Sequence, residues 1–335
     1  MYTKVRAGGA IMTPGAVYRS TMPFVWIKLL ISLSFKLVYG IILVSLFQAV
    51  QAMQAVGFYS LDQLAIPVVP IVMLVFVLPI LCFIFRRYGR YLVRVGHIAV
   101  VTKIIETGEV PERQVSYGFS MVRQHFGRAT VFFFLNKMVC RAIQELHAVV
   151  GNRLHGLGML GVIANAFKRK FLKYVDECCL AYTFTLTDTG AFVGTIKGIV
   201  VYFYAWQQMA KAAAFTLLKV TVITWIFRII CIGMLYLGVV SASLPLVIIS
   251  LFIFFVVGSL KTCMLDSYAM VTMLTTFLQE SKTTDVGTRA IQAIANISTS
   301  FRDLVFQANR TEPFMTPDEE AELFVNRNQN LNTIV

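Results

Sequence analysis

Residues 215–240 read FTLLKVTVITWIFRIICIGMLYLGVV, residues 241–243 read SAS, and residues 244–272 read LPLVIISLFIFFVVGSLKTCMLDSYAMVT. Each long run can cross a bilayer, because roughly 20 apolar residues in a helix span a hydrocarbon core of about 30 Å. The SAS break carries no charge and has room only for a tight turn. The stretch therefore predicts a transmembrane hairpin.

The composition of the whole chain also favours a membrane protein. Its 335 residues are 57% hydrophobic and 14% charged, whereas about 25% of the residues in soluble domains are charged. The net charge of +13 suits anionic lipid headgroups, and no basic patch belongs to a recognisable nucleic-acid module. We therefore expect anionic membrane lipids as partners and no nucleic acid.

A second hydrophobic hairpin precedes the first in the chain, with spans predicted over residues 24–50 and 64–85. Lysine and arginine flank both hairpins and avoid the turns at 51–63 and 241–243. The positive-inside rule then places both termini in the cytoplasm. The predicted fold is an all-α integral membrane protein with four transmembrane helices in two hairpins.

The sequence divides into five segments around these hairpins. They are a cytoplasmic N-terminus (1–23), the first hairpin (24–85), a basic inner-face layer (86–213), the second hairpin (214–272), and cytoplasmic C-terminal helices with a tail (273–335).

The inner-face layer is too apolar for a loop and too charged to span a membrane. Residues 127–150 have the spacing of an amphipathic helix, and residues 106–112 predict a turn on Gly108 and Pro111. Such helices are expected to lie at the inner interface, with a re-entrant excursion at 156–166 or 199–206 as the alternative. The residues expected to contact lipid headgroups are Arg86, Arg87, Arg90, Arg94, Lys168, Arg169 and Lys170.

The C-terminal segment carries two helix signals. Residues 286–305 place Ile291, Ile294, Ile297, Phe301, Leu304 and Val305 on one helical face. Further on, Thr316-Pro317-Asp318-Glu319 has the pattern of a capping box with proline at the first helical position, which predicts a short acidic helix.

Lys36 and Arg228 lie well inside the first and third predicted spans. A basic side chain at such depth costs several kcal/mol and usually faces a bundle interior or a cavity. We therefore predict an intramembrane cationic site at these two residues, with snorkelling to an interface as the alternative. The carboxylate of Asp266 is expected near the inner boundary, where Lys261 would pair with it.

The two hairpins also show a faint likeness to each other. Phe24, Lys28 and Lys36 align with Phe215, Lys219 and Arg228 when one residue of slip is allowed. Because both halves enter from the same side, this predicts a parallel repeat about an axis along the membrane normal. The alternative is a general similarity between any two hydrophobic hairpins.

No catalytic or metal-binding motif is present. The six cysteines have no paired C-x-x-C spacing, and G-x-S-x-G, H-E-x-x-H and P-loop patterns do not occur. The adjacent Asp176, Glu177, Cys178 and Cys179 are interpreted as a structural helix end. We expect no enzyme activity, no cofactor and no metal.

Residues 170–282 include FLKYVDECCLAYTFTLTDTGAFVGTIKGIVVYF and, after two spans, DSYAMVTMLTTFLQES. This part resembles the C-terminal part of choline transporter-like proteins, in which a helix ending in an alanine-tyrosine pair, here Ala181-Tyr182, precedes a membrane hairpin. The exit helix there ends in an acidic turn, here Gln279-Glu280. The chain lacks the larger number of spans of that family. It is also similar to uncharacterised bacterial multi-pass membrane proteins.

Two functions are consistent with these features. The first is a transporter or channel-like protein for a small anionic or zwitterionic solute, which the two intramembrane cations and the resemblance favour. The alternative is a non-transporting membrane scaffold or shaping protein whose basic inner helices bind anionic lipids. Because four spans make a small bundle, a homo-oligomer is expected.

Overall fold

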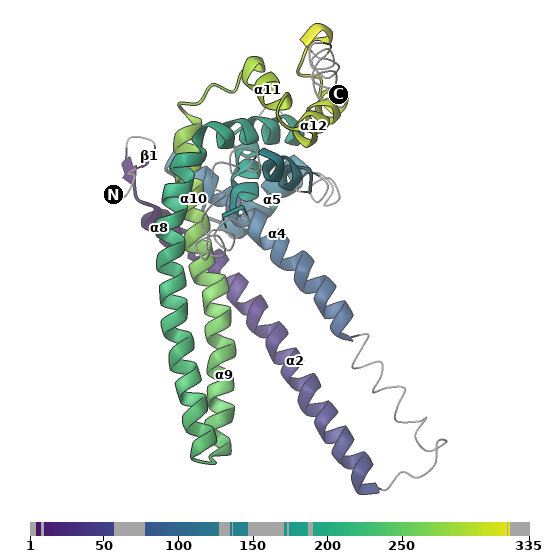
Figure 1. Ribbon diagram of the computed structural model, residues 1–335, viewed down its shortest axis with the longest axis vertical. Helices are drawn as coiled ribbons and strands as arrows, with labels where there is room; N and C mark the ends of the chain where they lie inside the picture. Colours follow the sequence, from purple (N-terminus) through teal and green to yellow (C-terminus); the bar gives the residue numbers. More distant parts are fainter. Residues whose placement is uncertain are drawn as a thin grey trace, which may run out of the picture. The chain divides into compact units, whose positions relative to one another are not determined.

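The computed structural model describes residues 5–7, 10–56, 78–126, 135, 137–146, 171–172, 174–186, 190–319 and 321. Over these residues the chain is helical, apart from a short antiparallel pair of strands, β1 (Val5–Ala7) and β2 (Ala10–Met12). The helical fold class is thus confirmed. Figure 1 labels the helices α2 (Met22–Val56), α4 (Leu78–Thr107), α5 (Gln114–Phe126), α8 (Ala191–Val240), α9 (Leu244–Leu260), α10 (Asp266–Ser281), α11 (Thr288–Ala295) and α12 (Thr299–Thr311). Helix α1 (Pro14–Ser20) precedes α2, and the π-helix η3 (Lys261–Leu265) joins α9 to α10.

Three segments among the described residues are long and apolar enough to cross a membrane: Met22–Ile42, Ala191–Val240 and Ile249–Ser281. Large apolar side chains on them remain exposed, including Ile229 at 63% and Phe252 at 68%. Exposed apolar surface of this extent indicates an integral membrane protein. The predicted span over 64–85 lies mostly outside the described residues, which resume at Leu78.

The chain forms two compact units. Unit 1 consists of Met1–Met22, Val95–Val222 and Asp266–Val335, and unit 2 consists of Pro23–Arg94 and Ile223–Leu265. Helices α4 and α8 each contribute residues to both units.

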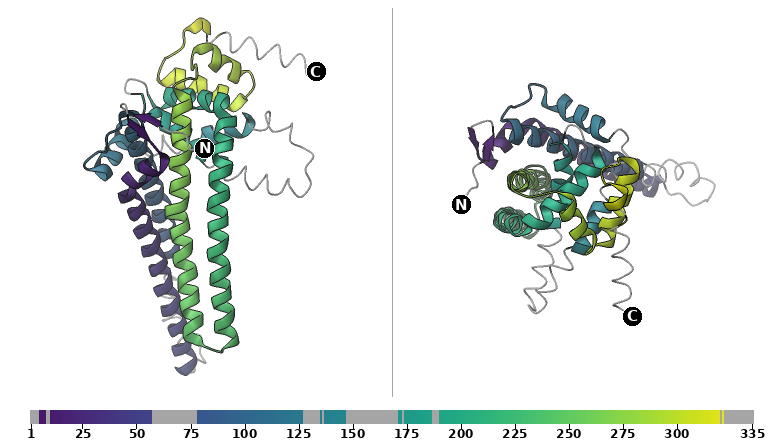
Figure 2. Two further views of the ribbon diagram at one scale, coloured as in Figure 1. Left: turned by 90° about the vertical axis from the view of Figure 1, so that its left-hand side faces the viewer. Right: turned by 90° about the horizontal axis from the view of Figure 1, so that it is seen from above.

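In unit 2, α8 and α9 form an antiparallel hairpin, and Figures 1 and 2 show the two helices side by side. The turn is a Schellman motif: the amide of Ser243 donates to the carbonyl of Gly238 (3.0 Å), and that of Ala242 donates to Val239 (3.1 Å). Ala242 has the left-handed φ of 49° that this motif requires. A Cβ at Gly238 would lie 3.0 Å from the backbone nitrogen of Val247, so glycine permits the close approach. The tight turn predicted from SAS is therefore present.

Unit 1 has a hydrophobic core of its own. Fully buried side chains from α4, α8, α10 and α12 form it, among them Ile98, Ile199, Phe277 and Phe301. Helix α1 packs on α10, where the rings of Tyr18 and Tyr268 meet edge to face with centroids 5.5 Å apart. Burial of this extent accounts for the apolar character of the inner-face sequence.

The amphipathic helix predicted within 127–150 is confirmed over its described part, 137–146. Lys137 and Arg141 are exposed, while Val139 and Ile143 are buried. The turn on Gly108 is also confirmed: α4 ends at Thr107, and Gly108 has a φ of 77°. Helix α8 runs unbroken through residues 199–206, and residues 156–166 lie outside the described residues.

The prediction of one helical face over 286–305 is wrong. Helix α11 ends at Ala295 and α12 begins at Thr299. The Ser298 hydroxyl caps α12 by accepting a hydrogen bond from the amide of Phe301 (3.1 Å), and this N-cap interrupts the helix. Ile297, predicted on the apolar face, is 42% exposed.

The capping box farther along is confirmed. The amide of Thr316 donates to the Glu319 carboxylate at 2.8 Å, and the amide of Glu319 donates to the Thr316 hydroxyl at 3.3 Å.

Candidate cationic site in unit 2

The centre of the site is a polar contact between α2 and α9. Ser32 and Lys36 lie one helical turn apart on α2, and Phe255 and Ser259 lie one turn apart on α9. The Ser32 and Ser259 hydroxyls hydrogen bond at 3.2 Å, and the Lys36 ammonium donates to the backbone carbonyl of Phe255. Hydroxyl and backbone partners of this kind hold helices together in a membrane.

The surroundings of Lys36 suit a cation that is partly removed from water. Its Nζ lies 5.8 Å from the ring centroid of Phe255, within the range of a cation–π interaction. A Cβ built on Gly258 would lie 3.7 Å from the same Nζ, so Gly258 of α9 also borders the ammonium group.

The site continues toward the π-helix η3 at the end of α9. Cys263 of η3 lies within hydrogen-bond reach of Ser32 and interacts electrostatically with Lys28, Lys36 and Arg90. On α2, Lys28, Ser32 and Lys36 follow one another at four-residue intervals, so they share one helix face. We call Lys28, Ser32, Lys36 and Arg90, with Ser259 and Cys263 facing them, the cationic ladder.

The charge balance of unit 2 is strongly one-sided. Residues Pro23–Arg94 contain six lysines and arginines, and Ile223–Leu265 contain two, against a single acidic residue, Asp62. Asp62 lies in the predicted outer turn, outside the described residues. Basic residues therefore outnumber acidic residues eight to one in the sequence of unit 2.

The structure places Arg228 differently from Lys36. Arg228 is exposed on α8 and forms no hydrogen bond or ion pair with the described residues. Arg228 lies 14 residues before the turn residue Ala242, and Phe255 lies 13 residues after Ala242. The hairpin therefore brings Arg228 and Phe255, the partner of Lys36, to a similar depth. The two predicted site cations therefore share a depth, but no interaction joins their side chains.

The other predicted residues are distributed as follows. Arg90 and Arg94 are half-buried on α4, while Arg86 and Arg87 lie on α4 with side chains outside the described set. Residues 168–170 lie outside the described residues. Lys261 begins η3 and Asp266 begins α10, and their ion pair stays a prediction.

Sequence reasoning missed the partners of Lys36 on α9. A signal was present, because residues 255, 259 and 263 repeat the four-residue spacing of 28, 32 and 36. What no local pattern supplies is that these two faces meet, since Ser32 and Ser259 are 227 positions apart.

Two other clusters in unit 1 have a weaker claim to be a site. The thiol of Cys140 lies 3.7 Å from the Asp176 carboxylate, and burial together with that carboxylate raises the pKa of Cys140 to about 12. A thiol with so high a pKa is a poor nucleophile and a poor metal ligand. Within the described part of the chain, no cluster of three or more ligating side chains fits a metal ion.

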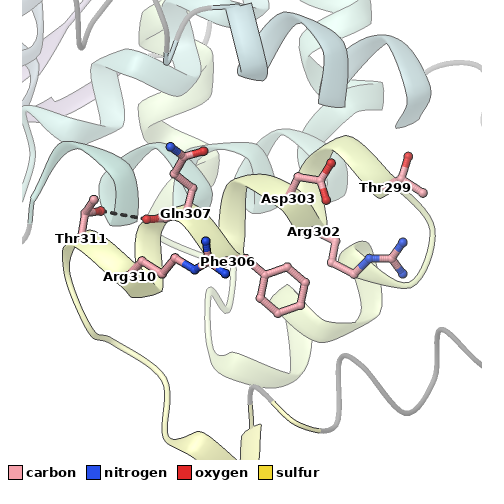
Figure 3. A pocket seen from close by; sticks show the side chains of 7 residues that line it. All are labelled: Thr299, Arg302, Asp303, Phe306, Gln307, Arg310 and Thr311. Carbon is pink, nitrogen blue, oxygen red and sulfur yellow. Dashed lines mark hydrogen bonds between the residues drawn. The ribbon is translucent and has the colours of Figure 1, made fainter.

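The second cluster lines a hollow of about 650 Å³ on the outer face of α12, shown in Figure 3. Its described walls come from this single helix, and Arg302 and Arg310 alternate there with Asp303 and Gln307. The Thr311 hydroxyl donates to the carbonyl of Gln307 (2.9 Å) within the same helix. Mixed charges on one solvent-facing surface are typical of a solvated helix face.

Comparison of the chain with family models, curated proteins and solved structures finds no match. The resemblance of residues 170–282 to choline transporter-like proteins stays a prediction.

Proposed function

We propose that this protein is a multi-pass membrane protein that binds anionic lipid through the cationic ladder. The observation that carries the proposal is the four-residue spacing of Lys28, Ser32 and Lys36 on one face of α2, where Ser32 meets the Ser259 hydroxyl and Lys36 the Phe255 carbonyl of α9. Half-buried cations that gather on one helix face favour an anionic ligand.

The extent of the ladder favours a headgroup over a continuous pathway. Lys28 to Lys36 spans about 12 Å along α2 at 1.5 Å per residue. Beyond Lys36, residues 37–56 of α2 carry no charge, and neither do residues 229–260 of α8 and α9. The charged groups therefore extend from one end of the helices to about the middle of the membrane. A phosphate headgroup that enters from one leaflet needs cations over this half only.

The proposed arrangement in the membrane has four spans in two hairpins with both termini in the cytoplasm. The uncharged turn between α8 and α9 and the basic residues at the opposite helix ends support it. The ladder then opens to the inner leaflet, where anionic lipids attract basic residues by about 1 kcal/mol each. In this arrangement the two hairpins form the parallel repeat.

A second candidate function is transport of a small anionic or zwitterionic solute. It is favoured by the similar depth of Lys36 and Arg228, because two cations at mid-depth would attract such a solute. Flux into liposomes separates the two functions. Transport through Arg228 requires that Arg228→Leu lowers flux, whereas the lipid-binding proposal expects no flux in either protein.

Homo-oligomerisation is proposed for the apolar outer surfaces of α8 and α9, where Trp225, Phe227 and Phe255 are exposed. The mass of the detergent-solubilised protein tests it, and a monomer mass would contradict it.

Lipid binding can be measured by native mass spectrometry of the full-length protein from nanodiscs of mixed phosphatidylglycerol and phosphatidylcholine. Wild-type protein is expected to retain the anionic lipid, and Lys36→Met or Lys28→Met is expected to reduce retention about fivefold, the effect of one lost cation. Methionine keeps the length of the side chain and removes its charge.

Arg228→Met is the matched control, because it removes a cation at a similar depth outside the ladder. It is expected to retain lipid as wild type does. Equal retention of the two lipids by the wild type, or an equal loss in Arg228→Met, would overturn the proposal.

A further inference from the structure

We propose that Arg228 and the apolar side chains around it on α8 dock a transmembrane helix of a different protein, one that carries a carboxylate at the depth of Arg228. This surface lies outside the cationic ladder, so the proposal goes beyond lipid binding and can fail or succeed independently of it.

Arg228 lies on an exposed, apolar face of α8. Trp225, Ile232 and Tyr236 are spaced from Arg228 by three, four and eight residues, so the four side chains share one helix face. The three apolar neighbours are 56%, 58% and 67% exposed, and Arg228 is exposed with them. We call these four residues the Arg228 face. Within a membrane such a face meets either lipid or another helix.

The chain treats its two deep cations differently. Lys36 donates to the backbone carbonyl of Phe255 and lies beside the ring of the same residue. Arg228, at a similar depth, forms no hydrogen bond or ion pair with the described residues. Ionised side chains within membrane helices are costly and almost always pair with another group. The partner of Arg228 is therefore sought outside this chain.

A second copy of the chain does not supply a carboxylate at this depth. Residues 23–94 contain only Asp62, in the predicted outer turn, and residues 189–265 contain no acidic residue. Asp266 lies 24 residues after Ala242, whereas Arg228 lies 14 residues before it. The difference of ten residues is about 15 Å along the helices, too far for an ion pair, and it is the same in a parallel copy.

A lipid phosphate is the less favourable partner for Arg228. The Nζ of Lys219 lies 4.1 Å from the ring centroid of Phe215, one turn toward the start of α8, as expected for a lysine that snorkels beside an aromatic ring at the membrane interface. Arg228 lies nine residues farther into the span, which is about 13.5 Å. A headgroup at the level of Lys219 is therefore distant from Arg228.

A carboxylate on a neighbouring helix matches the chemistry of the Arg228 face. The planar guanidinium binds a carboxylate through two parallel hydrogen bonds. Trp225 and Tyr236 flank the charge, and tryptophan, tyrosine and arginine are the residues that dominate binding at protein interfaces. The apolar side chains can pack against the partner helix and shield the ion pair from lipid.

The test uses the full-length protein in phosphatidylcholine liposomes at pH 8 with a synthetic transmembrane peptide. The peptide is a leucine–alanine helix of about 20 residues, with one glutamate 14 residues from the end that lies beside the α8–α9 turn, which matches the position of Arg228 relative to Ala242. Energy transfer from that end of the peptide to a label on Ser241→Cys measures association. The glutamate peptide is expected to bind at least about tenfold more tightly than a glutamine peptide.

Three variants assign the preference to Arg228. Arg228→Leu should abolish the preference for glutamate, and removal of a charge from an apolar face is not expected to impair folding. Lys219→Met is the matched control, because it removes an exposed cation of the same helix at another depth, and it should keep the preference. Arg228→Glu should instead prefer a peptide with arginine at the same position, an exchange that a purely structural role would not produce.

The other outcomes overturn the proposal. Equal binding of the glutamate and glutamine peptides by the wild type would exclude the ion pair. Loss of the preference in Lys219→Met would indicate a general attraction to basic residues. If Arg228→Leu lowers retention of phosphatidylglycerol in nanodiscs, Arg228 binds a headgroup, and if it dissociates an oligomer in detergent, the Arg228 face binds a second copy.

Discussion

The carboxylate of Glu145 anchors the start of α12 in unit 1. Its Oε2 accepts hydrogen bonds from the Ser298 hydroxyl (2.7 Å) and the amide of Ser300 (3.0 Å), and the Ser300 hydroxyl donates to Oε1. A negative charge at a helix N-terminus is favourable because it meets free amides and the positive end of the helix dipole. Glu145 therefore ties the helix at 137–146 to α12.

Glu145 should make the stability of unit 1 depend on acid. Burial by itself would raise the pKa of Glu145, but the hydrogen bonds from Ser300, Ser298 and Thr299 hold it below the ordinary value of 4.5. The stabilisation is therefore complete at neutral pH and is lost as the pH falls below about 4.5 and passes the lowered pKa. We expect Glu145→Gln to lower the free energy of unfolding by about 1 kcal/mol at pH 7, and we expect a smaller difference at pH 3. Denaturation of the purified protein in detergent at both pH values measures this.

The control for that experiment is Glu109→Gln, in the exposed turn after α4. It should leave stability unchanged within about 0.5 kcal/mol. If Glu145→Gln costs the same at pH 3 as at pH 7, the charge of the carboxylate is not what stabilises the contact.

Glu312 shows the opposite balance at the other end of α12. The amides of Val193 and Phe192, at the start of α8, hydrogen bond to its carboxylate, yet burial outweighs them and raises the pKa of Glu312. Because the folded pKa is raised, its contribution is greatest at low pH and is lost as the pH rises through the folded value. A Cβ on Gly190 would overlap this carboxylate, so any larger residue at the position before α8 would make the Glu312 side chain move. Glu145 and Glu312 thus contact the two ends of α12, and their contributions to stability depend on pH in opposite directions.

At the scale of elements, α8 carries glycines of two kinds. A Cβ on Gly198 would lie 2.4 Å from the carbonyl oxygen of Cys179, in the helix formed by residues 174–183. Gly233, farther along the same helix, has nothing within 4 Å of its Cβ position. Gly198 therefore permits close packing of two helices, and Gly233 has no packing role among the described residues.

The same substitution at these two positions should have opposite effects. Gly198→Ala forces the two helix backbones apart and is expected to lower the free energy of unfolding by about 1–3 kcal/mol. Gly233→Ala is expected to be neutral or to stabilise by about 0.5–1 kcal/mol, because alanine is the better helix former. Thermal unfolding of both variants in one detergent measures the contrast. Equal effects of the two changes would contradict the close contact at Cys179.

The elements that sequence predicts here are those with a local signal. Periodic apolar residues indicate the helix at 137–146, and Gly108 and SAS mark turns. The break at 296–298 was missed because the apolar spacing continues through it, although Ser298 is a favourable N-cap residue. The π-helix η3 has no signal in its sequence KTCML. The contact of α2 with α9 depends on packing between distant parts of the chain, so Lys36 could be singled out by its depth but its partners could not.

At the scale of the whole molecule, the hydrophobic content arises from two different sources. In unit 2 the apolar side chains of α8 and α9 face outward, as Ile229 and Phe252 do. In unit 1, apolar residues of the basic inner-face sequence fill a protein core, as Ile98 and Ile199 do. Composition alone does not separate these two uses, because exposed and buried apolar residues contribute equally to it. Because these apolar faces are buried in unit 1, the prediction that the inner helices lie at the lipid interface applies only to the faces that point away from this core.

The proposed orientation places the turn between α8 and α9 outside the cell and the turn after α4 inside. Ser241 and Glu109 are exposed in these two turns, so a cysteine at either position can react with a membrane-impermeant maleimide. Of the native cysteines whose side chains the structure describes, Cys178, Cys179, Cys231 and Cys263 are buried and Cys140 is half-buried, so their background labelling is expected to be low, with the unsubstituted protein as the control. Ser241→Cys should be labelled in intact cells, and Glu109→Cys only after permeabilisation, because the basic residues that flank each hairpin remain on the cytoplasmic side.

The reverse labelling pattern would invert the orientation and place the cationic ladder in the outer leaflet. Labelling of both cysteines in intact cells would contradict a membrane crossing between these two turns.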